Sequence, residues 1–216
     1  MAQRHAVKGN AKHPPSKRAN KGIIALIWGI ILTVVAGGVI FATSSYHESV
    51  RQRVKYSQYP RSYSEYVEQS AKKYDLETAL VYAVIRTESN FNPDAQSGAG
   101  AHGLMQITED TFDHYMFLRG EEGKYTLDDL YDPAVNIDYG CNILRDHLDQ
   151  FDDEECAVAA YNAGPGNVLE WLSDPSVSSD GKTLIVENIP FEETRNYVDR
   201  VESAKKTYIE LYGSDA

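Results

Sequence analysis

Cysteine and histidine are scarce in this sequence. It contains two cysteines and six scattered histidines among 216 residues. No group of them has the spacing of metal ligands, so we expect neither a metal site nor a cofactor. Cys141 and Cys156 fall on segments that we expect to be consecutive helices. A disulfide between them and two buried free thiols are both open at this point, because sequence does not give their Cα separation.

Strand patterns are also rare. No run of alternating polar and apolar residues is long enough for a sheet-based core, and no repeat of about 20–50 residues is visible. One small strand is expected at Leu184 to Val186. Beyond the N-terminal region the chain is typical of helices separated by Gly, Pro and Asn. The predicted fold class is therefore all-α, or mostly α.

Acidic residues are missing from the first 22 positions, which hold six Lys and Arg residues. The net charge of −11 over the whole chain therefore becomes −17 over residues 23–216. Nucleic-acid binding depends on neutralising phosphates with Lys and Arg, and an acidic domain is poorly suited to it. We therefore predict no nucleic-acid partner.

A run of twenty residues without a charge, 23–42, follows this basic segment. At about 1.5 Å per residue, a helix of this length spans roughly 30 Å, the thickness of a bilayer core. Basic residues before the run place the N-terminus in the cytoplasm and the domain outside. The alternative is a signal peptide, cleaved near residues 42–44 to release a secreted protein. The run exceeds the usual apolar region of about 7–15 residues, which favours a retained single-pass anchor in the cell membrane.

These features divide the chain into four parts. Residues 1–22 form a basic cytoplasmic tail that we expect to be disordered, and 23–42 form the transmembrane anchor. Residues 43–61 form a partly helical stalk, and 62–213 have the length of one ordinary domain. The expected oligomeric state is a monomer.

Capping residues and helix breakers predict seven helices within the domain. They are expected over 65–74, 76–88, from 109, 133–151, 154–162, from 167, and from after Pro190 to Tyr212. The predicted N-caps are Ser62 or Ser64, Asp75, Thr108 and Asp132, the last followed by Pro133 at the first helical position. The run 164–166, Gly-Pro-Gly, is expected to separate the fifth helix from the sixth.

One carboxylate is distinguished by its position. Glu88 continues the apolar stripe of Val84 and Ile85 into the last turn of the helix predicted over 76–88, and the chain leaves this helix before Pro93. Burial and the negative end of the helix dipole both disfavour the anion, so we expect a raised pKa for Glu88. A neutral carboxylic acid of this kind is typical of the general acid in glycosidic cleavage. The alternative is an ordinary Glu in solvent at a frayed helix end.

Three further segments carry polar side chains next to glycines or at helix ends. Gln106, in a glycine-rich segment, can donate and accept hydrogen bonds to sugar groups. Tyr161 and Asn162 follow small residues at the end of a predicted helix, and Tyr197 lies one turn into the last helix. Each segment taken alone is explained equally well as a loop or a helix cap.

Taken together and in this order, the four segments resemble the catalytic domain of the soluble lytic transglycosylase family. The family pattern is E-S-x-F, then A-x-S-x-A-G-A-x-G-L-M-Q-I, then A-Y-N-A-G, then P-x-E-T-R-x-Y-V. It appears here at 88–91, 95–107, 160–164 and, with one additional residue after Pro190, 190–198. The resemblance covers about residues 62–212. It departs at Glu109, where many relatives have Pro, and at Phe112, where a small residue is common.

The resemblance implies a lysozyme-like fold with a glycan-binding groove. It also implies non-hydrolytic cleavage of the β-1,4 bond between N-acetylmuramic acid and N-acetylglucosamine in peptidoglycan. Glu88 would act as general acid and then as general base, giving 1,6-anhydromuramoyl products. The attacking hydroxyl belongs to the substrate, so no second carboxylate is required.

The resemblance assigns further roles residue by residue. Tyr197 would hydrogen-bond Glu88 and orient it, with Glu193 as a supporting residue, and Met105 would pack beneath the groove. The residues implied to contact the substrate are Ser89, Gln106, Tyr161, Asn162 and Tyr197.

Two other functions stay open. A hydrolytic muramidase of the goose-lysozyme type would cut the same bond with water, and it needs a second acid. Asp94, Asp110 and Glu193 are candidates for that acid. A non-catalytic peptidoglycan-binding module would function without Glu88.

Overall fold

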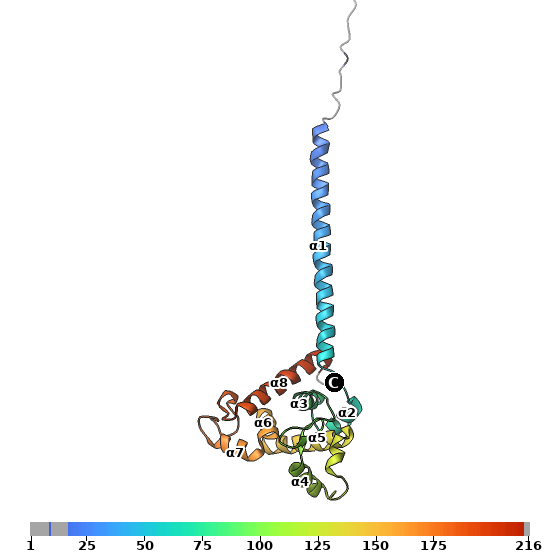
Figure 1. The fold of residues 1–216 in the computed structure, drawn as a ribbon. Helices are drawn as coiled ribbons and strands as arrows, with labels where there is room; N and C mark the ends of the chain where they lie inside the picture. Colours follow the sequence, from blue (N-terminus) through green and yellow to red (C-terminus); the bar gives the residue numbers. More distant parts are fainter. Residues whose placement is uncertain (1–8, 10–16, 214–216) are drawn as a thin grey trace, which may run out of the picture. The chain divides into compact units, whose positions relative to one another are not determined.

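The computed structural model describes Gly9 and residues 17–213 (Figure 1). The chain forms two compact units, which meet in the sequence between Lys55 and Tyr56. Each unit is described by itself below.

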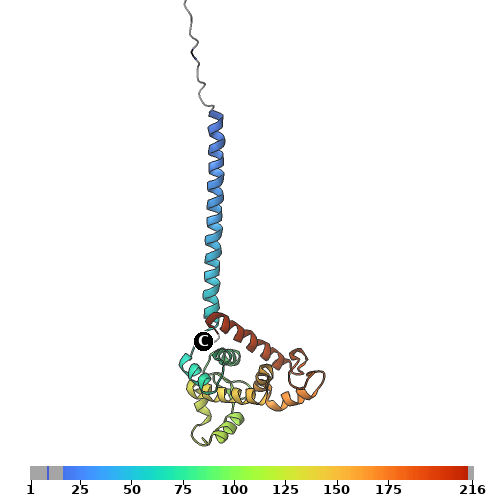
Figure 2. The same ribbon diagram turned by 180° about the vertical axis from the view of Figure 1, so that it is seen from behind.

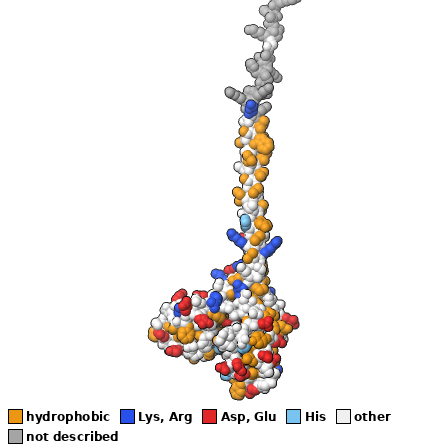
Figure 3. Space-filling model, viewed as in Figure 1, with side chains coloured by type: hydrophobic (Ala, Val, Ile, Leu, Met, Phe, Trp, Pro, Cys, Tyr) orange, Lys and Arg blue, Asp and Glu red, His pale blue; other side chains and the backbone are white. Residues whose placement is uncertain are grey.

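The first unit consists of most of helix α1, Lys17–Gln58, a single helix of 42 residues. Its apolar side chains between Ile23 and Phe41 are exposed, and Figure 3 shows them as a hydrophobic surface along the helix. The helix is long and apolar enough to cross a membrane. It also extends through most of the predicted stalk. The predicted disordered tail is corrected from Lys17 onward, where the helix begins, and residues 1–8 and 10–16 lie outside the described residues.

The second unit is helical, as predicted, with one small two-stranded sheet. Its elements are α2 Ser64–Lys73, α3 Thr78–Ser89, β1 Ala101–His102, β2 Ile107–Thr108, α4 Glu109–Arg119, η1 Leu127–Tyr131, α5 Pro133–Gln150, α6 Glu154–Ala163, α7 Pro165–Ser173, η2 Val186–Asn188 and α8 Glu192–Tyr212.

Helix α3 forms the centre of this unit. Every residue from Ala79 to Ile85 is at most 1% exposed, because a helix that is apolar on all sides must be covered on all sides. Helix α8 packs along α3, and both views of the ribbon place the two helices side by side (Figures 1 and 2). Helix α5 packs against α2 and α6, and α6 also contacts α7 and α8.

Two of the predicted N-caps are confirmed. The Thr108 hydroxyl accepts a hydrogen bond from the Thr111 backbone N–H at the start of α4. The Asp132 carboxylate accepts one from the Ala134 N–H, with Pro133 at the first position of α5. Each satisfies a donor that the helix itself leaves unpaired.

The predicted caps of the first two helices are wrong. Ser64 is the first residue of α2, not its cap, and the preceding Tyr63 has a left-handed conformation. Helix α3 begins at Thr78, so Asp75 does not cap it. Asp75 has φ of 52°, and the next N–H, of Leu76, donates to the carbonyl of Ala71. This left-handed residue therefore closes the C-terminus of α2.

The structure also decides three expectations about the C-terminal half of the chain: the start of α7, a strand at 184–186 and the state of the two cysteines. Helix α7 begins at Pro165, not after 166, because proline is well suited to a first helical position. The strand expected at 184–186 is absent from the described residues, where a 3₁₀ turn covers Val186–Asn188 instead. Cys141 and Cys156 are both buried free thiols, and burial raises the pKa of Cys156 to about 12.

The segment that enters the second unit is held by a group of side chains that we call the tyrosine clasp. The hydroxyl of Tyr212 donates to the carbonyl of Tyr59 at 2.8 Å, and that of Tyr208 donates to Pro60 at 3.0 Å. The guanidinium of Arg86, on α3, lies 4.0 Å from the centre of the Tyr59 ring. The clasp fixes the entering chain to α3 and α8.

Candidate active site

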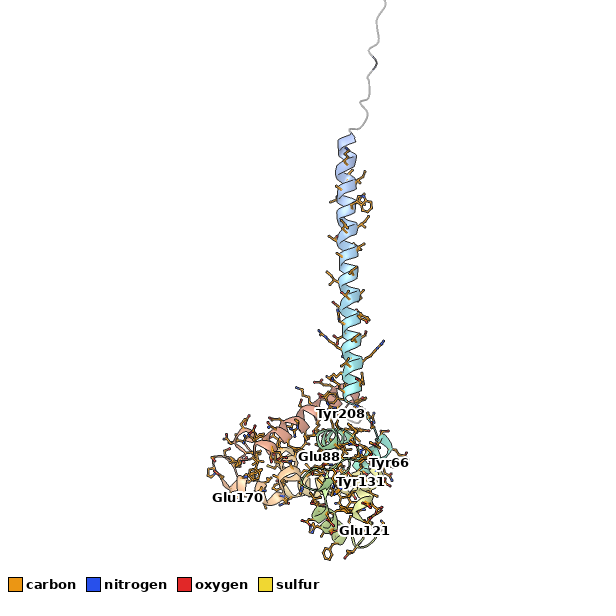
Figure 4. All side chains as sticks on the ribbon, in the orientation of Figure 1. Tyr66, Glu88, Glu121, Tyr131, Glu170 and Tyr208 are labelled. Atoms are coloured by element: carbon orange, nitrogen blue, oxygen red, sulfur yellow. The ribbon has the colours of Figure 1, made fainter. Side chains whose placement is uncertain are left out.

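Glu88 lies in the last turn of α3 and lines a cavity of about 290 Å³. The helix ends one residue later, at Ser89, because Asn90 and Phe91 adopt left-handed conformations with φ of 49° and 64°. Such values are uncommon for residues with a Cβ and often occur next to functional sites. Figure 4 places Glu88 among the helices of the unit, whereas Glu170 lies at its outer edge.

The surroundings of Glu88 favour its neutral form. Burial is the main cause and raises the pKa of its carboxyl from 4.5 to about 7. Glu193 raises the pKa further, while Tyr197 and Arg200 lower it. The Tyr197 hydroxyl faces the carboxyl from α8 but does not meet it in normal hydrogen-bond geometry, and it has no other partner among the described residues. The raised pKa agrees with the sequence-based prediction.

The loop around Gly103 forms another wall of the cavity and depends on a residue that the sequence analysis missed. Asn136 of α5 is fully buried, and its amide nitrogen donates to the carbonyls of His102 and Leu130 at 2.9 and 2.8 Å. Its oxygen accepts from the Met105 N–H at 2.7 Å. A polar residue on the inward face of an amphipathic helix was the available signal.

Gln106 lines the cavity at the end of this loop. It has a left-handed φ of 48°. Its side-chain nitrogen donates to the carbonyls of Gly103 and Ala95 at 2.9 and 3.2 Å. These bonds hold the strained turn and leave the side-chain oxygen as the group able to accept from a ligand.

Tyr161 and Asn162 close the cavity from the end of α6. The Tyr161 hydroxyl donates to the Met105 carbonyl at 2.9 Å, and burial raises the pKa of Tyr161. The Asn162 side-chain oxygen accepts from the Thr194 hydroxyl at 2.8 Å, which ties α6 to α8. Both side chains are therefore fixed before any ligand binds.

The remaining predicted residues differ in whether they line the cavity that contains Glu88. Ser89 donates its hydroxyl to the Leu104 carbonyl at 2.7 Å and does not appear among the residues that line the cavity in the described part of the chain. Met105 is fully buried. Glu193 lines the cavity and is exposed. Asp94 is exposed and is not one of the lining residues described, and Asp110 lines the neighbouring cavity.

That neighbouring cavity has a volume of about 620 Å³ and lies between α4, α5 and the start of α7. The two cavities share lining residues and so form one continuous groove, in which Glu88 belongs to the smaller limb. The shared residues are Thr108, Thr111, Ile143, Tyr161 and Asn162. No three His, Cys, Asp or Glu side chains within the described residues are grouped to hold a metal ion.

Comparison with known proteins gives this groove its context. The model of the transglycosylase SLT domain matches residues 65–183, which is more than half of the chain. The chain belongs to the SLT domain family. The match begins within α2 and ends before α8, so it contains Glu88, the loop around Gly103 and the end of α6.

Curated relatives and solved structures agree with the family assignment. The soluble lytic murein transglycosylase of Escherichia coli strain K12 is 35% identical over 144 residues, 66% of this chain and 22% of that protein. Membrane-bound lytic murein transglycosylase C of Haemophilus ducreyi is 34% identical over 170 residues, 70% of this chain and 46% of that protein. The SLT chain thus spans less than half the length of these relatives.

The structure of the 70 kDa soluble lytic transglycosylase of Escherichia coli superimposes with a TM-score of 0.67 at 32% identity, covering 74% of this chain and 26% of that one. The structure of an inactive mutant of lytic transglycosylase Slt from Pseudomonas aeruginosa superimposes with a TM-score of 0.63 at 35% identity. The match covers 72% of this chain and 25% of that one. These matches confirm the predicted all-α, lysozyme-like fold of the SLT domain.

Proposed function

We propose that this protein is a peptidoglycan lytic transglycosylase. It would cleave the β-1,4 bond between N-acetylmuramic acid and N-acetylglucosamine without water and leave a 1,6-anhydromuramoyl end. The observation that carries the proposal is Glu88, a largely buried carboxyl with a pKa near 7 that lines a groove of an SLT domain. Such a group can give and take a proton near neutral pH.

The proposed reaction needs one carboxyl and two proton transfers. Glu88 protonates the glycosidic oxygen as the bond from that oxygen to muramoyl C1 breaks, and N-acetylglucosamine leaves with a new hydroxyl. The muramoyl 6-hydroxyl oxygen then bonds to C1 and gives its proton back to the Glu88 carboxylate. The carboxyl ends the cycle protonated, as microscopic reversibility permits. Because the nucleophile is part of the substrate, its effective concentration is high.

The other groove residues have supporting roles in this proposal. Tyr161 and Asn162, both fixed by hydrogen bonds, would contact the sugars next to the cleaved bond, and the free oxygen of Gln106 would accept from a sugar hydroxyl or amide. Tyr197 would act as a positioning residue for Glu88. The Ser89 hydroxyl donates to the Leu104 carbonyl. This favours a role in fixing the loop around Gly103 rather than direct contact with the substrate.

A hydrolytic muramidase is the second candidate, and one observation favours it. Glu193 lines the same cavity as Glu88 and raises its pKa, so a second carboxyl is near enough to act on the first. A carboxylate in that position is able to activate a water for inversion. The products distinguish the two reactions, because hydrolysis adds a water to the muramoyl end.

Mass spectrometry of the released fragments tests the proposal. Purified peptidoglycan is digested with the full chain in detergent micelles, and the soluble muropeptides are analysed. We expect muramoyl ends that are lighter by one water than hydrolysed ends. Hydrated reducing ends would overturn the transglycosylase and support the muramidase, and binding without release would support the non-catalytic module.

The pH dependence of turnover should follow the protonation of Glu88. The acid form begins the reaction, and its pKa is about 7. We therefore expect kcat/KM to be constant below about pH 6 and to fall roughly ten-fold per unit above about pH 8. In Arg200→Met the fall should move to higher pH, because Arg200 lowers the pKa of Glu88. A wild-type profile that falls from about pH 4.5 would contradict this prediction.

Tyr197→Phe should reduce turnover more than stability. The variant removes a buried hydroxyl that has no partner of normal geometry, so we expect a change of under about 1 kcal/mol in the free energy of unfolding. Turnover should fall about ten-fold, and the pH profile should move to higher pH, since the hydroxyl lowers the pKa of Glu88. An equal loss of stability and activity, with an unmoved profile, would make Tyr197 structural only.

We also propose that α1 anchors the protein in the cell membrane with its N-terminus in the cytoplasm. The long apolar helix and the membrane-bound relatives support the anchor, and the basic residues before the apolar run support this orientation. Protease added to intact cells should then digest the SLT domain. A fragment released without α1 would instead support the cleaved signal peptide.

A further inference from the structure

The larger limb of the groove has an unusual charge composition. Lys and Arg are absent from the residues described as lining it. Asp110 and His114 lie one turn apart on α4 and share a face of that helix. Asp146 and His147 line the opposite side from α5. The limb therefore carries negative charge at neutral pH and disfavours anionic ligands.

His147 has no partner that explains its position. Its side chain is only 8% exposed and lines the limb, and no hydrogen bond to either ring nitrogen is present among the described residues. The ring contacts Tyr161 edge-on, with 6.4 Å between the ring centres. Burial lowers the pKa of His147 against the opposing effect of Asp146, which favours the neutral imidazole with one unprotonated nitrogen as an acceptor. The residue lines the limb and its ring has no hydrogen-bond partner among the described residues, so this nitrogen is available to a ligand in the limb.

Asp146 supplies a second acceptor beside it. The carboxylate is partly buried, and the amide of Asn142 approaches one oxygen at a weak 3.4 Å. Burial, and after it the nearby Asp146 carboxylate, raise the pKa of Tyr115 on the α4 side of the limb. No cation pairs with Asp146 among the described ion pairs, whereas Asp149, one turn further along α5, pairs with Arg145 at 2.6 Å. Asp146 thus keeps an unneutralised charge toward the groove.

We propose that this limb binds an ammonium group carried by the substrate, with the Asp146 carboxylate and the neutral His147 imidazole as its acceptors. An ammonium group has three donors and no acceptor, which matches a wall of acceptors without Lys or Arg. Tyr161 lines both limbs, so the bound amine lies next to the sugars at the cleaved bond. The inference rests on the proposed function and names the substrate feature that the groove selects.

Two parts of a peptidoglycan strand can carry such an amine. One is the side chain of a diamino acid in a stem peptide, and the other is an amino sugar that has lost its acetyl group. Both present the same chemistry to Asp146 and His147. The experiment below separates them by removing the stems and, independently, the acetyl groups.

The test compares the KM for release of anhydromuramoyl ends from peptidoglycan with free amines and from the same material after acetylation. The whole 216-residue chain is used in detergent micelles. For the wild type we expect acetylation to raise KM about ten-fold, the value of a charge-assisted hydrogen bond. Asp146→Asn and His147→Leu should have a raised KM on free amines and little further change on acetylation. Asp149→Asn, a matched control on the same helix, should behave as the wild type.

Substrates without stems identify the source of the amine. If stem removal abolishes the preference, the limb binds the stem amine. If strands that lack stems but are partly deacetylated still show the preference for free amines, the limb binds the sugar amine. The proposal would be overturned if acetylation left the wild-type KM unchanged. It would also be overturned if the Asp146→Asn variant kept the full wild-type preference for free amines. Thermal midpoints of the variants check that each remains folded.

Failure of the proposed function would be recognised separately. Glu88→Gln, which should bind but not cleave, is sedimented with insoluble peptidoglycan before and after acetylation. A binding preference for free amines, lost when Asp146→Asn is added, supports the limb even if no anhydromuramoyl product forms. Equal binding to both materials overturns it regardless of the product chemistry.

Discussion

Glu88→Gln should reduce the release of anhydromuramoyl ends by roughly 10³-fold or more, with the fold intact. Gln has nearly the same shape as protonated Glu but cannot give up a proton, so it removes both the acid and the base step. Product quantification by mass spectrometry under single-turnover conditions measures the effect. Glu170→Gln, an exposed position on α7, is the matched control and should leave the rate unchanged.

The same variant should be more stable than the wild type at high pH. The pKa of Glu88 is raised from 4.5 to about 7 on folding. Its full contribution to stability is therefore present below pH 4.5, and is lost as the pH rises to about 7. The loss is about 3 kcal/mol, and Gln avoids it. Urea unfolding should give similar stabilities at pH 4 and a more stable variant at pH 8.

Two results would contradict this account of Glu88. Retained cleavage by Glu88→Gln would mean that another group is the acid, and Glu193→Gln would then be the variant to measure. A variant less stable than the wild type at both pH values would mean that the carboxyl makes a stabilising contact that Gln cannot replace. Either outcome would remove the argument from the raised pKa.

Gly103→Ala should destabilise the protein by about 4 kcal/mol or more and abolish activity. Gly103 has φ of 74°, and an added Cβ would overlap the Leu130 carbonyl oxygen and the Asn136 amide. Neither group can move easily, because Asn136 is fully buried. Its side-chain oxygen accepts a hydrogen bond from the Met105 N–H, and its side-chain nitrogen donates one to the Leu130 carbonyl. The loop would have to move, with loss of buried hydrogen bonds. Urea unfolding and turnover measure the two effects.

Gly120→Ala separates the backbone cost from the steric cost. Gly120 has a similar φ of 63°, but an added Cβ would have no atom within 4 Å. We expect a loss of about 1–2 kcal/mol there, from the left-handed conformation alone. If the two variants lose the same stability, the packing of Gly103 against Asn136 has no energetic importance.

Local patterns were sufficient for most of the helices. The caps at Thr108 and Asp132 bond to N–H groups only two or three residues away, so spacing along the chain contains the needed information. Asp75 shows the limit of this reasoning. An Asp between two helices can cap the start of the second helix or close the end of the first. Here the hydrogen bond from the Leu76 N–H to the Ala71 carbonyl shows that it closes the first.

The candidate site was predictable where the chemistry lies within one segment. The position of Glu88 followed from the apolar stripe of α3, and its raised pKa followed from burial. Asn136 was missed because its partners lie up to 34 residues away along the chain. The hairpin of β1 and β2 was missed because strands of two residues have no periodicity to detect.

The second limb of the groove could not be predicted from spacing. Asp146 and His147 lie on α5, and they face residues of α4 only because of how the two helices pack. Sequence places each on an amphipathic helix, where a polar residue is ordinarily solvated. The absence of Lys and Arg from the whole wall becomes visible only when the lining residues are assembled in space.

The tyrosine clasp gives the SLT domain a mechanical property. The clasp joins the entering chain to α3 through Arg86 and to α8 through Tyr208 and Tyr212. Those two helices also carry Glu88 and Tyr197. The clasp thus links the chain at Tyr59 directly to the two helices that hold Glu88 and the hydroxyl proposed to position it. For the proposed membrane-anchored enzyme, tension on the entering chain would therefore bear on the geometry around Glu88.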